Sequence, residues 1–142
     1  MWIGAAFPQA ARSLYYRRIV SKAPMSTNFY QRPKGAAEFD ERENHIGLST
    51  ASLFMFQAHV SRQLTSFKSW MAQLQTDGIE IVDEYGLVHT LEQFSDVVGA
   101  PPQAARHAVC ANSPVVPAGG SLRGIDRYRD EDGHLFYTAS FS

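Results

Sequence analysis

The chain has 142 residues, of which 44% are apolar, and this size and composition suit one domain with one hydrophobic core. The formal net charge of −1 argues against a nucleic-acid partner, and no stretch approaches the roughly 20 apolar residues of a membrane span. The single cysteine, Cys110, excludes an internal disulfide and a thiolate metal cluster. It indicates a reducing, cytoplasmic setting.

The N-terminal segment differs in charge from the rest of the chain. Residues 1–24 carry four basic residues and no acid, whereas residues 25–142 carry nine basic and fourteen acidic residues. We expect residues 1–24 to be a basic extension without its own fold, placed before the start-like Met25. A transit peptide is the alternative interpretation.

Residues 25–44 are polar and contain Pro33 and Gly35, which predicts an arm or loop. The following residues, 45–142, are predicted to form a single α+β domain. Its first element is predicted as a central helix over residues 50–64. Four apolar residues at helical spacing carry that prediction: Leu53, Phe56, Val60 and Leu64. A strand over the letters LFMF is the alternative.

The middle of the chain shows the clearest local signals. Residues 66–77 carry apolar residues at the spacing of one buried helical face, and residues 79–82 then alternate as a strand does. A turn over residues 83–86 follows, in which Gly86 supplies a positive φ. The tetrapeptide from Thr90 to Gln93 is a capping box that opens another helix.

The C-terminal part begins with a proline- and glycine-rich loop over residues 99–121. The letters RYRDEDGHLFYT then predict a second hairpin, in which Asp132 and Gly133 form the turn. This hairpin is expected to pair with the strand at residues 79–82 or with that strand's neighbour. The predicted fold is therefore about three helices packed on a small antiparallel sheet made from two hairpins.

The acidic turns are the first candidates for chemistry. Asp83, Glu84 and His89, with His134, have the ligand types of a divalent-metal site, and this set carries one alternative function, a metal-dependent hydrolase or nuclease. The other interpretation is turn chemistry, in which an aspartate accepts hydrogen bonds from its own backbone. The second interpretation is favoured because each residue has a structural role in a hairpin.

The arginine-rich stretch before the last turn is the second candidate. On a strand, alternate residues share a face, so Arg127 and Arg129 lie together and Arg123 is expected on the same side. With the aromatic residues Tyr128 and Tyr137, these arginines form a candidate partner-binding face. A solvated face balanced by nearby acids is the equally weighted alternative.

Motifs for common chemistries are missing from the sequence. It contains no phosphate-binding glycine loop, no nucleophile elbow and no dinucleotide fingerprint, so no cofactor is expected. The leading hypothesis is a small non-enzymatic binding protein that acts by protein–protein contact.

The stretch from Phe67 to Ser142 resembles small uncharacterised proteins of bacteriophages and prophages. The resemblance rests on an aromatic helix, a D-E-Y-G turn, a short helix, a proline-rich segment and an ending of the form D-x-[ED]-G-x-x-F…FS. It carries no catalytic residue. It implies an accessory protein that acts on a host or defence protein in the cytoplasm of a bacterial host.

Overall fold

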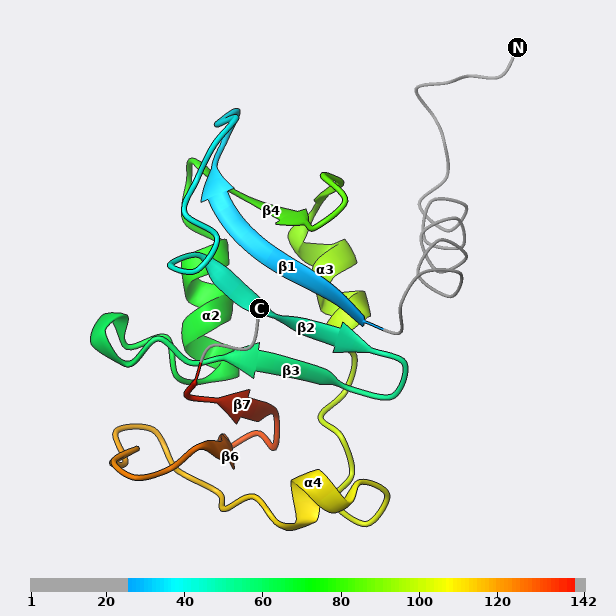
Figure 1. Cartoon of the computed structure of the whole chain (residues 1–142), viewed down its shortest axis with the longest axis vertical. Helices are drawn as coiled ribbons and strands as arrows, with labels where there is room; N and C mark the ends of the chain where they lie inside the picture. Colours follow the sequence, from blue (N-terminus) through cyan, green and yellow to red (C-terminus); the bar gives the residue numbers. More distant parts are fainter. Residues whose placement is uncertain (1–25, 140–142) are drawn as a thin grey trace.

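A computed structural model describes residues 26–139 (Figure 1). The prediction that residues 1–24 form an extension lies outside the described residues. The described part is built around one mixed sheet of seven strands, in the order β5-β4-β1-β2-β3-β7-β6. The strands are β1 (Ser26–Pro33), β2 (His45–Thr50), β3 (Phe54–Gln57), β4 (Ile79–Asp83), β5 (Val88–His89), β6 (Arg127–Arg129) and β7 (Leu135–Tyr137).

Neighbouring strands pair in antiparallel fashion except β3 and β7, which run parallel. The register between β1 and β2 shifts near Phe29 and Tyr30, which gives a bulge at Ile46. Next to that bulge, Gly47 leaves room for the ring of Phe54, because a β-carbon there would collide with it.

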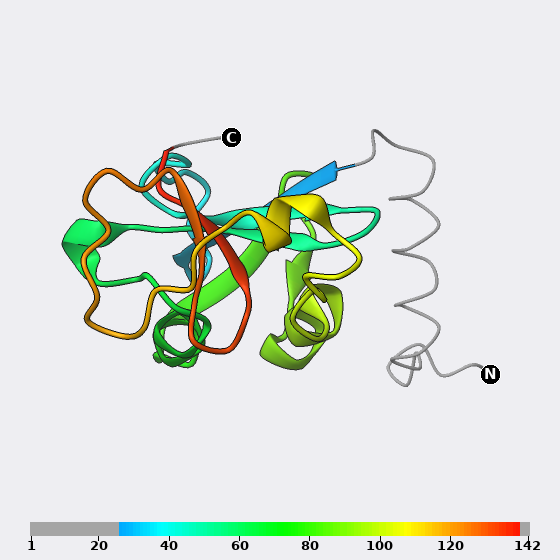
Figure 2. The ribbon, with the colours of Figure 1, turned by 90° about the horizontal axis from the view of Figure 1, so that it is seen from below.

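Four helical segments complete the fold of residues 26–139. They are the 3-10 helix η2 (Val60–Arg62) and the α-helices α2 (Phe67–Leu74), α3 (Leu91–Val98) and α4 (Ala108–Ala111). Figure 2 shows that α2 and α3 cover the same face of the sheet, while Figure 1 places α4 at the β6 end. None of the helices within residues 26–139 is long and apolar enough to cross a membrane.

The core lies between the sheet and these two helices. Alternate residues of each strand point toward it, so Phe29, Phe54, Phe56 and Phe136 meet Trp70 of α2 and Phe94 of α3. All six side chains are at most 3% exposed. The rings meet mainly edge to face, as between Phe54 and Phe94, or stacked, as between Phe56 and Phe136.

Two helices begin where the sequence predicted. Ser66 caps α2, and Thr90 caps α3, each by accepting a hydrogen bond from the amide three residues later. Both are reciprocal capping boxes, completed by the side chains of Ser69 and Gln93. The predicted helix at 66–77, the strand at 79–82 and the helix after Thr90 are confirmed.

The predicted architecture is wrong. Instead of about three helices on a sheet made from two hairpins, a seven-stranded mixed sheet carries short helices. Strands β1 and β2 were not predicted, and β3 lies where only the alternative interpretation, a strand over the letters LFMF, placed one. These three strands are neighbours in the middle of the sheet.

The two missed regions have specific physical reasons. The first part of the predicted polar arm is β1, which buries the polar side chains of Thr27 and Gln31 and so lacks an apolar alternation. The predicted helix at 50–64 contains β3 instead, because Phe54 and Phe56 face the core while Gln57 is buried on the other face. A short apolar run is compatible with the spacing of a helix and with that of a strand.

The second hairpin forms as predicted over β6 and β7, but its neighbour is different. The expected pairing with the strand at 79–82 is wrong, because β7 pairs with β3. Strands β1 and β2 lie between β4 and β3, so β4 is far from β7. The two hairpins therefore form opposite ends of the sheet.

Candidate functional site: the two hairpins

The turn between β4 and β5 is organised by the buried carboxylate of Asp83. Its Oδ1 accepts hydrogen bonds from the amides of Tyr85 (2.8 Å) and Leu87 (3.0 Å). Its Oδ2 lies 3.0 Å from Nε2 of His89. Gly86 has a φ of 86°, a conformation that favours glycine. Asp83 is only 3% exposed, so its carboxylate is used inside the turn.

The turn between β6 and β7 repeats this arrangement around Asp130. Its Oδ1 accepts from the amides of Asp132 (3.0 Å) and His134 (2.9 Å), two and four residues later, as in the first turn. Gly133 has a φ of 95°. The Oδ2 atom differs in its partner: it accepts from the amide of Phe67, 2.7 Å away at the start of α2. This carboxylate therefore stabilises both a turn and a helix N-terminus.

The residues of the metal-dependent alternative do not converge. The Glu84 carboxylate accepts a hydrogen bond of 2.6 Å from the amide of Asn28, which ties the turn to β1. Asp83 and His89 contact each other, but His134 belongs to the opposite hairpin. Within residues 26–139, no group of three or more His, Cys, Asp or Glu side chains is arranged to hold a metal ion.

His134 is part of the core. Its ring stacks on Phe67 with centroids 4.2 Å apart and meets Phe56 edge to face. Burial lowers the pKa of His134, because the charged ring would lose its hydration, although Asp130 and Asp132 oppose that shift. A neutral ring packed between aromatic side chains contributes to folding.

A second buried polar cluster lies on the sheet face opposite α2 and α3. His45 is 1% exposed, with Nε2 2.8 Å from Oδ1 of Asn28 and Nδ1 3.4 Å from Oε1 of Gln57. Burial lowers the pKa of His45 to about 4. Gln57 also donates to the carbonyls of Tyr137 and Ala139. The cluster joins β1, β2 and β3 to the end of β7.

The predicted arginine face is not continuous. Arg127 is exposed on β6, whereas Arg123 lies in the preceding loop. Arg129 is half-buried and donates from Nε to the carbonyl of Ser113 at 3.2 Å. Tyr128 is 1% exposed and belongs to the core, while Tyr137 is half-buried. A role for Arg123 and Arg127 in partner binding stays a prediction.

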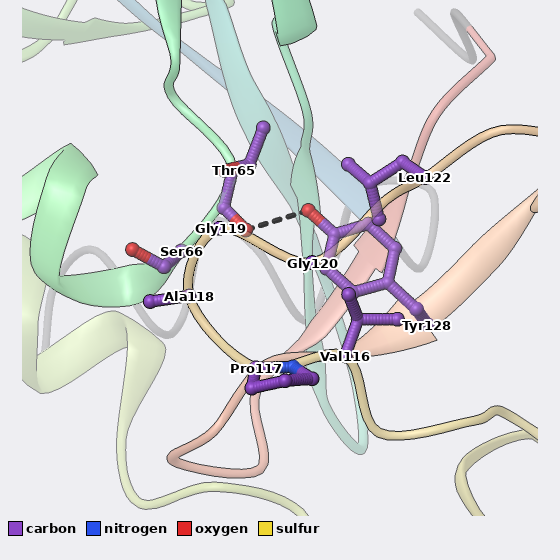
Figure 3. A pocket seen from close by; sticks show the side chains of 9 residues that line it. All are labelled: Thr65, Ser66, Val116, Pro117, Ala118, Gly119, Gly120, Leu122 and Tyr128. Atoms are coloured by element: carbon purple, nitrogen blue, oxygen red, sulfur yellow. Dashed lines mark hydrogen bonds between the residues drawn. The ribbon is translucent and has the colours of Figure 1, made fainter.

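Tyr128 also forms one wall of a small cavity. Figure 3 shows its hydroxyl pointing at the carbonyl of Thr65, to which it donates a 2.6 Å hydrogen bond. The loop from Val116 to Leu122 closes the other side. The volume of about 20 Å³ admits one water molecule and no substrate.

The two ends of the sheet differ in how they are covered. Beside β6, the amide of Val116 donates to the carbonyl of Arg129, and the amide of Arg129 donates to the carbonyl of Pro114, both at 2.8 Å. Val115 forms a parallel bridge there. Beyond β5, by contrast, no strand or bridge of the described residues continues the sheet.

The β5 end also exposes apolar side chains. Tyr85, Leu87 and Val88 are 44%, 40% and 47% exposed. Tyr85 comes directly before Gly86, and the other two come directly after it. Only two other large hydrophobic residues within residues 26–139 are this exposed: Val60 and Val115. We call Tyr85, Leu87 and Val88, together with the outer edge of β5, the hairpin edge.

Sequence reasoning identified the turn but missed the hairpin edge. The position of β5 at the end of the sheet depends on the pairing of β4 with β1, which the letters after Gly86 do not reveal. Comparison of the chain with protein-family models, curated proteins and solved structures found no match.

Proposed function

We propose that the protein is a small non-enzymatic binding protein that acts by protein–protein contact through the hairpin edge. The observation that carries the proposal is the combination of an uncovered outer strand with three exposed apolar side chains beside it. Outer strands present unpaired backbone groups, and monomeric proteins usually cover or charge them. An uncovered, apolar strand edge suits a partner.

The side chains at the hairpin edge have the character of interface anchors. Tyr85 offers an aromatic ring with a polar end, a residue type enriched in interfaces, and Leu87 and Val88 add apolar area. The turn beneath them is held by Asp83 and Gly86, so the surface is already ordered before a partner binds.

The resemblance of the segment from Phe67 to Ser142 to phage and prophage proteins supports a narrower proposal. In it, the protein is a phage accessory protein whose partner is a host or defence protein in the bacterial cytoplasm. The single cysteine, Cys110, is buried and has no disulfide partner in the sequence, which suits a reducing compartment.

Affinity purification from bacterial lysate tests the contact surface. We expect the wild-type chain and the Val60→Lys variant to recover the same specific partner, and the Val88→Lys variant to lose it. Val60 is the matched control, because it is 57% exposed and lies in η2, between β3 and α2, outside the hairpin edge. Both substitutions are expected to change the free energy of unfolding by less than about 0.5 kcal/mol.

An arginine variant separates the hairpin edge from the arginine face. Recovery of the partner by Val88→Lys, together with its loss by a chain carrying Arg123→Ala and Arg127→Ala, would reject the hairpin edge and favour the arginines. Equal recovery by all variants would reject both surfaces.

A further inference from the structure

The backbone of β5 is oriented to accept another strand. The amide of Asp83 donates to the carbonyl of Leu87, so these two residues form a hydrogen-bonded pair. Such pairs alternate along an antiparallel ladder, and Val82 with Val88 is the next pair. The N–H and C=O groups of Val88 therefore point away from β4, toward the open side of the sheet.

The electrostatic character of this end is acidic. From Ser69 to Ala105 the chain has six acidic residues and no lysine or arginine. From Arg106 to Ala139, which includes the other hairpin, four acidic residues are balanced by four arginines. Glu80 is paired with Arg32 at 2.6 Å and Asp83 is buried in the turn, so Glu84, Glu92 and Asp96 supply the exposed negative charge near β5.

Several of these acids are exposed close to the hairpin edge. Glu84 is part of the turn, and Glu92 and Asp96 lie one helical turn apart on α3, which directly follows β5. Tyr30 lies on the sheet face away from α3. It pairs with Val82, which in turn pairs with Val88. Burial raises the pKa of the Tyr30 hydroxyl to about 12, and the negative charges of Glu41 and Glu84 add to the shift.

We propose that the partner supplies an extended basic segment, apolar at alternate positions, which adds to β5 as a further strand of the sheet. This proposal rests on the proposed function and names the partner chemistry of the same surface. Main-chain hydrogen bonds to Val88 provide the pairing, while the apolar residues of the segment pack beside the Val88 side chain, on the sheet face away from α3. The lysine or arginine residues at the alternate positions then lie on the α3 face, toward Glu92 and Asp96.

The short length of β5 makes the charges important. A two-residue strand offers few main-chain hydrogen bonds, so side-chain contacts and charge must supply much of the affinity. A second copy of the chain on the same edge would bring Glu84 and its neighbours close to identical acids. Like-charge repulsion disfavours that occupant.

Peptide titration of the full chain tests this chemistry. The probes are eight-residue peptides of alternating lysine and valine, of alternating glutamate and valine, and the lysine–valine peptide with every backbone amide N-methylated. Fluorescence anisotropy measures the dissociation constants. We expect the lysine–valine peptide to bind about tenfold or more tightly than the glutamate–valine peptide, and N-methylation to remove binding.

Two controls localise the binding. Val88→Lys should weaken the lysine–valine peptide by about tenfold or more, because the new charge repels it, and Val60→Lys should not. Equal affinity for the lysine and glutamate peptides would overturn the basic partner. Undiminished binding of the N-methylated peptide would overturn strand addition.

Other occupants give different results. Sedimentation analysis showing a dimer that Val88→Lys converts to monomer would identify a second copy as the occupant and overturn the proposal. A tenfold gain in peptide affinity for a chain carrying Arg17→Glu and Arg18→Glu would identify the basic N-terminal segment as the occupant, with the same consequence.

Failure of the peptide chemistry is distinguishable from failure of the proposed function. If no peptide binds while Val88→Lys still loses the partner from lysate, the hairpin edge stands as a contact surface and the basic strand is rejected. If Val88→Lys keeps the partner, the contact surface itself is rejected.

Discussion

The two hairpins have the same kind of turn, but their outer strands are covered differently. In both, an aspartate Oδ1 accepts the amides two and four residues later, and a glycine with positive φ follows three residues after the aspartate. The β6–β7 hairpin continues into the core through Tyr128 and Phe136, and residues 114–116 cover its outer strand. The β4–β5 hairpin ends in an exposed edge.

The comparison indicates that the aspartates of the two turns are structural residues. Both aspartates are buried, and each carboxylate is engaged in three hydrogen bonds inside the protein, which gives both a structural role in their turns. The repeated letters D-x-x-G specify a turn. The property that distinguishes the hairpins is the exposure of their outer strands, and this property supports a role for β5 in binding.

The largest difference in stability between the two hairpins is expected from Oδ2 of the turn aspartate, which contacts α2 only in Asp130. Asp130→Asn keeps the turn acceptor but places an amide donor against the amide of Phe67, so a buried hydrogen bond is lost together with the charge at the α2 N-terminus. We expect a loss of about 3 kcal/mol in urea unfolding. Asp132→Asn, at an exposed neighbour, is the control. Equal losses for the two variants would contradict the assigned role of Asp130.

The glycines are expected to differ less. Gly86→Ala and Gly133→Ala each force an L-residue into a positive φ, which costs about 1–2 kcal/mol. Gly133→Ala should cost more, because its new β-carbon would lie 3.3 Å from Cβ of Pro101, whereas the space at Gly86 is open. Thermal unfolding of both variants measures the difference. A larger loss for Gly86→Ala would break the comparison.

Asp83→Asn should be milder than Asp130→Asn. The asparagine oxygen can still accept hydrogen bonds from the amides of Tyr85 and Leu87, and its amide nitrogen lies beside Nε2 of His89. We expect a loss of about 1 kcal/mol at neutral pH in urea unfolding. A loss as large as that of Asp130→Asn would show that the charge of Asp83 is essential to the turn.

Acid should destabilise the β6–β7 hairpin through His134. Burial lowers the pKa of this histidine in the folded protein, so below the unfolded value of about 6.5 the unfolded chain binds the proton first. Stability is therefore complete above that pH and falls as the pH decreases. His134→Phe keeps the stacking on Phe67 and should give a shallower fall of stability below about pH 6.5 in chemical unfolding. An unchanged slope would contradict the buried neutral histidine.

Local signals predicted the parts of the fold that depend on neighbouring residues. The capping residue Thr90 and the turn glycines Gly86 and Gly133 have their expected roles. Each of these features is determined within a few residues of sequence, so spacing and residue type are sufficient to identify it.

The centre of the sheet depends on contacts between distant residues. Thr27 and Gln31 are polar yet buried, and the side chain of Gln31 accepts a hydrogen bond from Gln73 of α2. Such a partner cannot be read from the letters of β1. The place of the hairpin edge at one end of the sheet has the same origin, because it follows from the pairing of β4 with β1.

A photo-crosslinker placed at each end of the sheet in turn tests whether the hairpin edge is the contact surface. A benzophenone side chain replaces Tyr85 in one variant and Val115 in another, since both residues are well exposed, and the cells are irradiated before the adducts are analysed by mass spectrometry. We expect an adduct with one defined partner from position 85 and none from position 115. The same adduct from position 115, or none from position 85, would reject the hairpin edge as the contact surface.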